Sequence, residues 1–194
     1  MRLFTSIELP SDIRRAISWW MPPLAEEEWV RRGWFPDDEG IKLKWVAEET
    51  LHITLKFFGE VAEDRVAELC DSLKKIATEG PALLWPGPTN CFPNRGPVAT
   101  VVLEVQGQVD RLERLYEALE AKGRQLGIPQ DRRPFHPHIT VGRARPVLPQ
   151  DVRAGLSGKT MKTQHQFIAT EFVLMQSLLK PEGPQYIPVA RFPL

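Results

Sequence analysis

Two short segments of the chain repeat one pattern, in which a histidine and a threonine alternate with aliphatic residues. They are His-Ile-Thr-Leu at residues 52–55 and His-Ile-Thr-Val at residues 138–141. Two histidines that face one cleft can hold opposite protonation states near neutral pH, because the ordinary imidazole pKa is about 6.5. One imidazole then takes a proton while the other gives one, which is what hydrolysis of a phosphodiester requires.

Thr54 and Thr140 follow His52 and His138 by two residues, so each hydroxyl stands on the same strand face as its histidine. Hydroxyl groups donate hydrogen bonds to non-bridging phosphate oxygens and stabilise the charge that develops there. The scheme requires no metal and no other cofactor. A single His-x-Thr is more often an exposed pair without function. Two copies in the same frame, using two of the four histidines in the chain, favour catalysis.

His136 lies on the same expected strand face as His138, and such a His-x-His pair would be a conceivable metal-binding arrangement. The surrounding sequence offers no cysteine and no obvious carboxylate as a third ligand. A capping or packing role for His136 is the favoured interpretation, and we expect no metal site.

The period of two in both segments predicts strands with one buried face. In the first strand, His52, Thr54 and Lys56 are expected to face the cleft, whereas the aliphatic residues and Phe57 are expected to face the core. In the second strand, the histidine and the threonine share one face in the same way. The two strands would then present a matched couple from each half of the molecule to one cleft.

The remaining sequence predicts the elements that must position these strands. Helices are expected near residues 10–20, 60–77 and 108–126, and further strands at 2–9, 44–46, 98–105, 166–179 and 186–192. Residues 80–97 contain five prolines and are expected to form a loop, with a strand only at 82–85. The pattern predicts a single bilobal α+β domain over residues 1–194. Two mainly antiparallel sheets with outer helices are expected to surround a central cleft with pseudo-two-fold symmetry.

The segment Met21–Leu43 breaks the helical pattern with Pro22-Pro23 and carries two tryptophans, Trp29 and Trp34. An irregular loop or a helix extension on the surface is the favoured interpretation. The alternative is an aromatic lid over the cleft.

Composition restricts the partners. The chain has 194 residues, with 25 basic and 25 acidic side chains and a formal net charge of zero. It therefore has no overall positive field to hold a long polyanion, and a nucleic-acid partner would be held by an end or a short piece. Cys70 and Cys91 are expected to be reduced, and no signal peptide or membrane span is indicated. We expect a cytoplasmic monomer.

Three stretches carry a resemblance to a known family: residues 2–10 (RLFTSIELP), 51–60 (LHITLKFFGE) and 133–143 (RPFHPHITVGR). They resemble the 2H phosphoesterase superfamily. Within it they are similar to the bacterial and archaeal RNA 2′,3′-cyclic phosphodiesterases, also called 2′-5′ RNA ligases. The resemblance covers nearly the whole chain. The chain departs from the family pattern at Thr5, where an aromatic residue is often found.

The resemblance implies metal-independent hydrolysis of a terminal ribose 2′,3′-cyclic phosphate to a 2′-phosphate. The expected partners are RNA ends or short nucleotides carrying that group. The resemblance implies that His52 gives a proton to the leaving 3′ oxygen and that His138 takes one from water. It also implies that Thr54 and Thr140 bind the phosphate and that Arg143 approaches it. Strand parity places Arg143 on the opposite face from His138 unless Gly142 permits a bulge or twist.

Other assignments remain open at this point. Phe92 and Tyr186 are candidates for stacking on a base, but a place in the core is as good an interpretation. The same histidine and threonine frame would serve a phosphodiesterase of 2′-5′ oligoadenylates or small cyclic nucleotides. It would also serve a nucleotide-binding module without turnover. Reversible 2′-5′ ligation of RNA is a further expected capacity.

Overall fold

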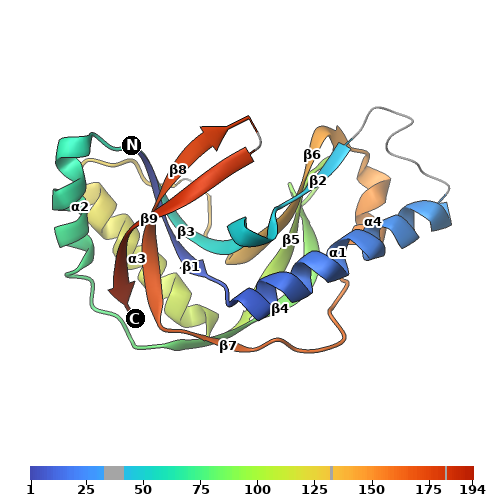
Figure 1. The fold of residues 1–194 in the computed structure, drawn as a ribbon, viewed down its shortest axis with the longest axis horizontal. Coiled ribbons are helices and arrows are strands. Elements are labelled where there is room, and N and C mark those ends of the chain that lie inside the picture. Colours follow the sequence, from blue (N-terminus) through green and yellow to red (C-terminus); the bar gives the residue numbers. More distant parts are fainter. Residues whose placement is uncertain (33–41, 132, 182) are drawn as a thin grey trace.

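The computed structural model describes residues 1–32, 42–131, 133–181 and 183–194 (Figure 1). Its strands are β1 (Arg2–Glu8), β2 (Lys42–Trp45), β3 (His52–Glu60), β4 (Ala82–Phe92), β5 (Val98–Gly107), β6 (His138–Leu148), β7 (Phe167–Ala169), β8 (Glu171–Lys180) and β9 (Gly183–Pro193). Its α-helices are α1 (Ser11–Arg32), α2 (Val66–Leu73), α3 (Val109–Gln125) and α4 (Arg153–Leu156). Single 3-10 turns are η2 (Glu48–Thr50), η3 (Glu63–Arg65) and η4 (Gln150–Val152).

The described strands form one sheet in the order β7-β4-β5-β6-β3-β1-β8-β9, with β2 paired to β6. Each of these pairings is antiparallel. The two halves of the sheet meet at β3 and β6, which share the single pair Ile53 and Ile139. The expected α+β class with antiparallel strands is confirmed, and the two expected sheets are halves of one sheet joined at this narrow seam.

Helices cover the core side of the sheet. Figure 1 shows α2 and α3 beside the half that contains β1 and β3, and α1 and α4 beside the half that contains β4, β5 and β6. In α3, Leu112, Leu115 and Leu119 recur at helical spacing and are buried. In α1, Ile13 and Ile17 do the same. These stripes pack with the inward side chains of the strands into one main hydrophobic cluster.

The helix expected near the N-terminus is longer than predicted, because α1 continues through Pro22 and Pro23 to Arg32. The interpretation of this segment as a helix extension is confirmed up to Arg32. Residues 33–41 and the side chain of Trp29 lie outside the described part of the chain, and with them the alternative of an aromatic lid.

The strand expected at residues 82–85 is confirmed, but the loop expected after it is wrong up to Phe92, because β4 runs from Ala82 to Phe92 and pairs with both β5 and β7. The strand accommodates its prolines at an irregularity: the pairing with β5 shifts register between Pro86 and Thr89. Proline lacks the N–H that a regular ladder needs, so such a shift is where it is tolerated. The strand expected at 166–179 is divided into β7 and β8.

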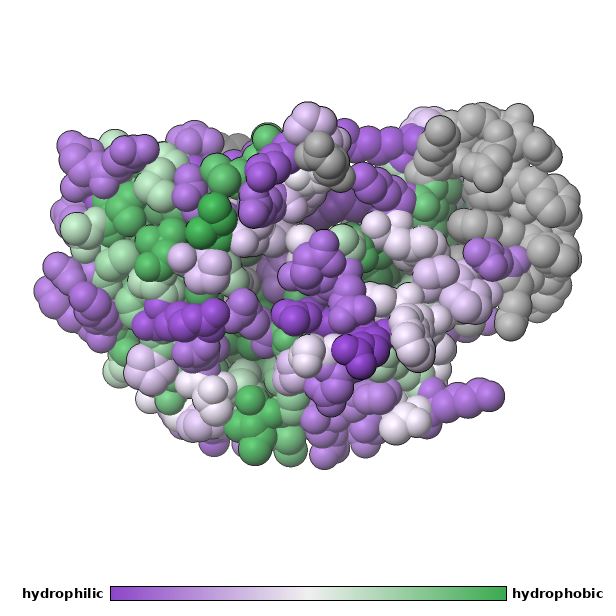
Figure 2. Space-filling model, in the orientation of Figure 1, coloured by the Kyte–Doolittle hydropathy of each residue, from purple (hydrophilic) through white to green (hydrophobic). Residues whose placement is uncertain are grey.

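No helix in the described ranges has both the length and the apolar character needed to cross a membrane. Figure 2 shows hydrophilic residues over the centre of one face, with hydrophobic residues gathered mainly to the left of the view. The most exposed large hydrophobic side chains, Trp19, Ile168 and Leu179, come from three different elements.

Candidate active site

The pair Ile53 and Ile139 lies at the centre of the candidate site. Both side chains are fully buried on the core side. Because β3 and β6 are antiparallel, one flank of this pair holds His52 and Thr140, and the other holds Thr54 and His138. Side chains alternate along a strand, so all four flanking residues point to the face opposite the core. The structure thus brings both predicted couples together on one face, related by an approximate two-fold axis.

A β-bulge within each motif changes the face of the residues that directly follow it. In β3, Ser6 pairs with Thr54 and Thr5 pairs with Lys56, so Leu55 is an extra residue. In β6, Val102 pairs with Thr140 and Val101 pairs with Gly142, so Val141 is an extra residue. Each bulge lies three residues after the motif histidine. A bulge places two successive side chains on one side and reverses the parity beyond it.

The bulges show that the predicted faces of Lys56 and Phe57 are wrong, and they explain the face of Arg143. Lys56, expected at the cleft, is in the core and only 2% exposed, whereas Phe57, expected in the core, is 55% exposed. Arg143 is exposed on the same side as His138, as the bulge alternative at Gly142 required. A Cβ at Gly142 would lie 3.1 Å from both Leu43 and Trp45, so glycine also lets β2 pack closely here.

Both histidines are oriented by the same local hydrogen bond. The Nδ1 atom of His52 lies 2.7 Å from the carbonyl oxygen of Thr50, and Nδ1 of His138 lies 2.7 Å from that of His136. A carbonyl only accepts, so Nδ1 carries a proton in both rings. In the neutral rings Nε2 is therefore free to accept a proton. Nε2 of His52 lies 2.9 Å from Oγ1 of Thr54, whose hydroxyl donates to it.

His52 lies in aromatic surroundings. The ring centroid of Phe4 is 5.2 Å from that of His52, and Tyr186 meets His52 edge-on at 5.1 Å. Burial lowers the pKa of His52, and the positive charges of Arg143 and His138 lower it further. The Thr50 carbonyl and Glu8 act in the opposite direction. His52 is therefore mainly neutral near pH 7 in the free protein.

His138 is less enclosed and has one aromatic neighbour, Phe92, which meets it edge-on at 5.2 Å. Burial lowers the pKa of His138, the His136 carbonyl raises it, and Arg143 lowers it again. Arg143 therefore acts on both histidines and also lowers the pKa of the Tyr186 hydroxyl, which burial raises. Its guanidinium is the positive charge shared by the two halves of the site.

The aromatic residues of the site were only partly predictable. Phe92 and Tyr186, the two stacking candidates, are both half-buried and both in contact with a motif histidine. Phe4 and Phe57 were missed, and their rings lie 5.7 Å apart. Thr5, where the family pattern led us to expect an aromatic residue, is buried beside Lys56, and Oγ1 of Thr5 accepts the Lys56 N–H at 3.3 Å.

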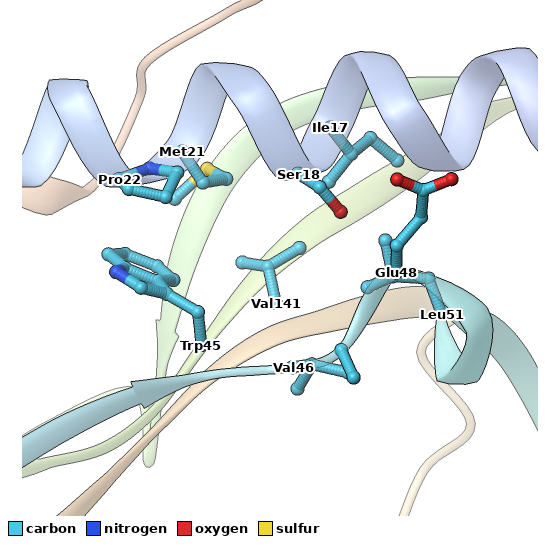
Figure 3. A pocket seen from close by; sticks show the side chains of 10 residues that line it. Ile17, Ser18, Met21, Pro22, Trp45, Val46, Glu48, Leu51 and Val141 are labelled. Atoms are coloured by element: carbon cyan, nitrogen blue, oxygen red, sulfur yellow. The ribbon is translucent and has the colours of Figure 1, made fainter.

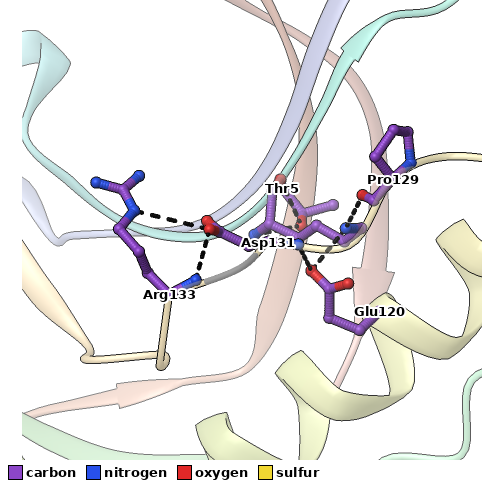
Figure 4. A network of polar contacts seen from close by, with 6 residues as sticks. Thr5, Glu120, Pro129, Asp131 and Arg133 are labelled. Atoms are coloured by element: carbon purple, nitrogen blue, oxygen red, sulfur yellow. Dashed lines mark hydrogen bonds and ion pairs between the residues drawn. The ribbon is translucent and has the colours of Figure 1, made fainter.

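A buried ion pair holds the first motif strand to the segment that leads into the second. Nζ of Lys56 lies 2.6 Å from Oε1 of Glu120 on α3 and also donates to the Pro129 carbonyl (Figure 4). The same Glu120 oxygen accepts the backbone N–H of Asp131 at 3.5 Å. Phe135, three residues before His138, stacks on Tyr116 of α3 at 4.4 Å. The chain segment before His138 is thus held against α3 at two points, Asp131 and Phe135.

A cavity of about 250 Å³ lies behind the site between α1, β2 and η2. Figure 3 shows Met21, Trp45 and Val141 on its walls, with Ser18 and Glu48 toward one end. Val141 follows Thr140 in β6 and points to the core, so this cavity is on the other face of the strand from the histidines. The cavity is therefore separate from the face that carries the two histidines.

The described residues contain no group of three His, Cys, Asp or Glu side chains placed to hold a metal ion. His136 is exposed, and its backbone carbonyl oxygen accepts the hydrogen bond from Nδ1 of His138. The arrangement of Nε2 atoms, hydroxyls and one guanidinium is suited to proton transfer around an anion.

The chain matches the 2′-5′ RNA ligase superfamily over residues 22–180. A protein from Archaeoglobus fulgidus, an RNA 2′,3′-cyclic phosphodiesterase, is 31% identical over 188 residues, which are 96% of each chain. A crystal structure from Thermus thermophilus has a TM-score of 0.74 and 28% identity, covering 100% of this chain and 98% of that one. The crystal structure of Escherichia coli LigT with 3′-AMP has a TM-score of 0.70 and 25% identity, covering 100% and 97%.

Proposed function

This chain belongs to the 2′-5′ RNA ligase superfamily, and from that membership we propose that it is an RNA 2′,3′-cyclic phosphodiesterase. The reaction is hydrolysis of a terminal ribose 2′,3′-cyclic phosphate to a 2′-phosphate and a free 3′-hydroxyl. One observation carries the proposal: two His-Thr couples flank the Ile53 and Ile139 pair on one face, with Nδ1 of both imidazoles tied to a carbonyl.

The two imidazoles supply the proton transfers. Nε2 of His138 takes a proton from water as the water oxygen attacks phosphorus. The bond between phosphorus and the 3′ oxygen breaks, and Nε2 of His52, protonated in the complex, gives its proton to that oxygen. The negative charge of the bound phosphate raises the pKa of His52 and offsets the burial that lowers it in the free protein. Solvent returns both rings to their starting states after product release.

The remaining site residues hold the phosphate. Thr54 and Thr140 donate to its non-bridging oxygens, and Arg143 pairs with the charge that grows on them in the transition state. Binding requires the Thr54 hydroxyl to turn from Nε2 of His52 to the phosphate. That rotation leaves Nε2 free for the leaving oxygen. If a 5′-hydroxyl replaces the attacking water, the same steps form a 2′-5′ phosphodiester, which accounts for ligation.

The experiment measures turnover of a short RNA with a 2′,3′-cyclic phosphate end, in the presence of a chelator. The substitutions His52→Ala and His138→Ala are each expected to lower kcat by about 10²- to 10⁴-fold, the usual contribution of a general acid or base. His165→Ala is the matched control, because His165 lies before β7 and away from both motif strands. Phosphorus NMR is expected to show a 2′-monoester as the product.

Several results would contradict the proposal. Full activity in His52→Ala or His138→Ala would remove that histidine from the mechanism, and a 3′-monoester product would reverse the assignment of the leaving oxygen. Calorimetric binding of 2′-AMP without turnover of any cyclic phosphate would instead indicate a nucleotide-binding module. Loss of activity with chelator would show that a metal takes part.

A further inference from the structure

The strand next to the second motif carries a carboxylate on the cleft face. In the register of β5 and β6, the facing pairs are Thr100 with Arg143, Val102 with Thr140, and Glu104 with His138. Directly opposite residues of an antiparallel pair have Cβ atoms about 4.5–5.5 Å apart and point to the same face. Glu104 is therefore the cross-strand neighbour of His138, and its side chain is half-buried.

The Glu104 carboxylate is held in place by Asn90 of β4. Nδ2 of Asn90 donates to Oε1 of Glu104 at 2.9 Å, and Oδ1 of Asn90 accepts the backbone N–H of Cys91 at 2.8 Å. With both ends of the amide engaged, its orientation and that of the carboxylate are fixed. Among the described residues, Asn90 is the one side chain seen to donate to Glu104.

A carboxylate in this position is a poor neighbour for a phosphate, because like charges repel. It suits N–H donors instead. The base of a nucleotide is attached to C1′, next to the C2′ atom that carries the cyclic phosphate, so a residue beside His138 is within reach of the base. Phe92 lies on this same side of the cleft, edge-on to His138, and offers an aromatic surface for the base.

We propose that Glu104, oriented by Asn90 and accompanied by Phe92, forms a nucleobase subsite that selects guanine at the cyclic-phosphate end. This inference rests on the proposed function and names its substrate more narrowly. Guanine alone presents two adjacent N–H donors, N1–H and the N2 amine, which match the two oxygens of one carboxylate. Adenine and cytosine present one amine beside a ring nitrogen acceptor. Uracil presents one N–H between two carbonyl groups.

The test compares kcat/KM for the four nucleoside 2′,3′-cyclic phosphates in wild type, Glu104→Gln and Glu117→Gln. Glu117 is an exposed residue of α3, on the core side of the sheet, so its substitution makes the same charge change away from the cleft. Wild type and Glu117→Gln are expected to prefer guanosine over uridine by about tenfold or more, the usual discrimination of one bidentate base contact. Glu104→Gln is expected to lose most of that preference, because kcat/KM falls more for guanosine than for uridine.

Equal wild-type rates on all four substrates, or an equal loss on all four in Glu104→Gln, would overturn the inference and leave the proposed function standing. If wild type turns over neither these nucleotides nor the RNA with a 2′,3′-cyclic phosphate end, the proposed function fails instead. In that case, calorimetry with guanosine and uridine 2′-monophosphates still tests the subsite. Tighter binding of the guanosine nucleotide by wild type, abolished in Glu104→Gln, supports the subsite. Equal binding of the two nucleotides overturns it. Asn90→Ala, which frees the carboxylate, is expected to weaken the preference partly.

Discussion

Removing Lys56 is expected to destabilise the protein severely. The side chains of Lys56 and Glu120 are only 1% and 7% exposed, and their charged atoms lie 2.6 Å apart. In Lys56→Met, a side chain of similar length replaces the lysine and leaves the Glu120 carboxylate in the core without its cation. Breaking a buried pair in this way costs about 3–5 kcal/mol, a large part of the 5–15 kcal/mol that holds a typical domain folded. The Asp131 N–H, which donates to the same carboxylate, offsets part of it.

Urea unfolding, followed by tryptophan fluorescence, measures the effect. The double variant Lys56→Met/Glu120→Leu removes both charges and is expected to recover most of the lost free energy, because the unpaired charge is the main cost. Lys74→Met is the control. It breaks a lysine–aspartate pair of similar length, 2.9 Å, in which both side chains are 64% exposed, and is expected to change stability little.

The reasoning fails if Lys56→Met unfolds at the same urea concentration as Lys74→Met, or if the double variant is no more stable than the single one. The first result would mean that Glu120 is satisfied without Lys56. The second would mean that the aliphatic packing of the lysine stem, rather than its charge, provides the stability.

Three further predictions follow from the same structure. Stability is expected to fall as the pH drops below about 6.5, because burial lowers the pKa of His52 and His138 and the unfolded chain then binds protons first. Urea midpoints at pH 8 and pH 5.5 should show a smaller loss in His52→Gln/His138→Gln than in wild type. Gly123→Ala is expected to destabilise α3 despite the better helix propensity of alanine, because its Cβ would lie 2.7 Å from Cε of the tethered Lys56. A higher urea midpoint in that variant would contradict this. Tyr186→Ala is expected to raise the pKa of His52 by exposing it, and an unchanged NMR titration of the His52 ring would show that the tyrosine does not shield it.

The sequence was sufficient for the parts of the fold that depend on local periodicity. The alternation around His52 and His138 predicted both motif strands, and the helical stripe of leucines predicted α3. Only the start of β4, residues 82–85, was predicted, because the prolines that follow are typical of a loop, whereas pairing on both edges makes the whole segment a strand. Such pairing depends on partners far along the chain, and local propensity does not contain it.

The faces of Lys56 and Phe57 were mispredicted for a related reason. The prediction assumed that side chains alternate between the two faces along the whole of β3. The register of β3 shifts after Thr54, and only its pairing with β1 reveals the shift. In the second motif Gly142 provided a local signal for the bulge. Lys56 occupies the equivalent position in the first motif and gives no such signal. A comparison of the two motifs with each other would have transferred the bulge from one to the other.

The two bulges also suit a nearly symmetric backbone to the opposite proton-transfer roles that we propose for its two histidines. Each places the residue five after its histidine on the cleft side, and the chain has Phe57 in one half and Arg143 in the other. The half of His138 therefore contributes the positive charge that we propose for binding the phosphate, whereas the half of His52 contributes an apolar wall of Phe4 and its neighbours. Apolar surroundings lower the pKa of an imidazole, and a bound anion raises it again. Such an imidazole therefore gains its proton when the anion binds, and it can then donate that proton as a general acid. In the proposed mechanism, the more accessible His138 takes the proton from water. The asymmetry thus arises from side-chain identity at equivalent positions and not from different backbone folds.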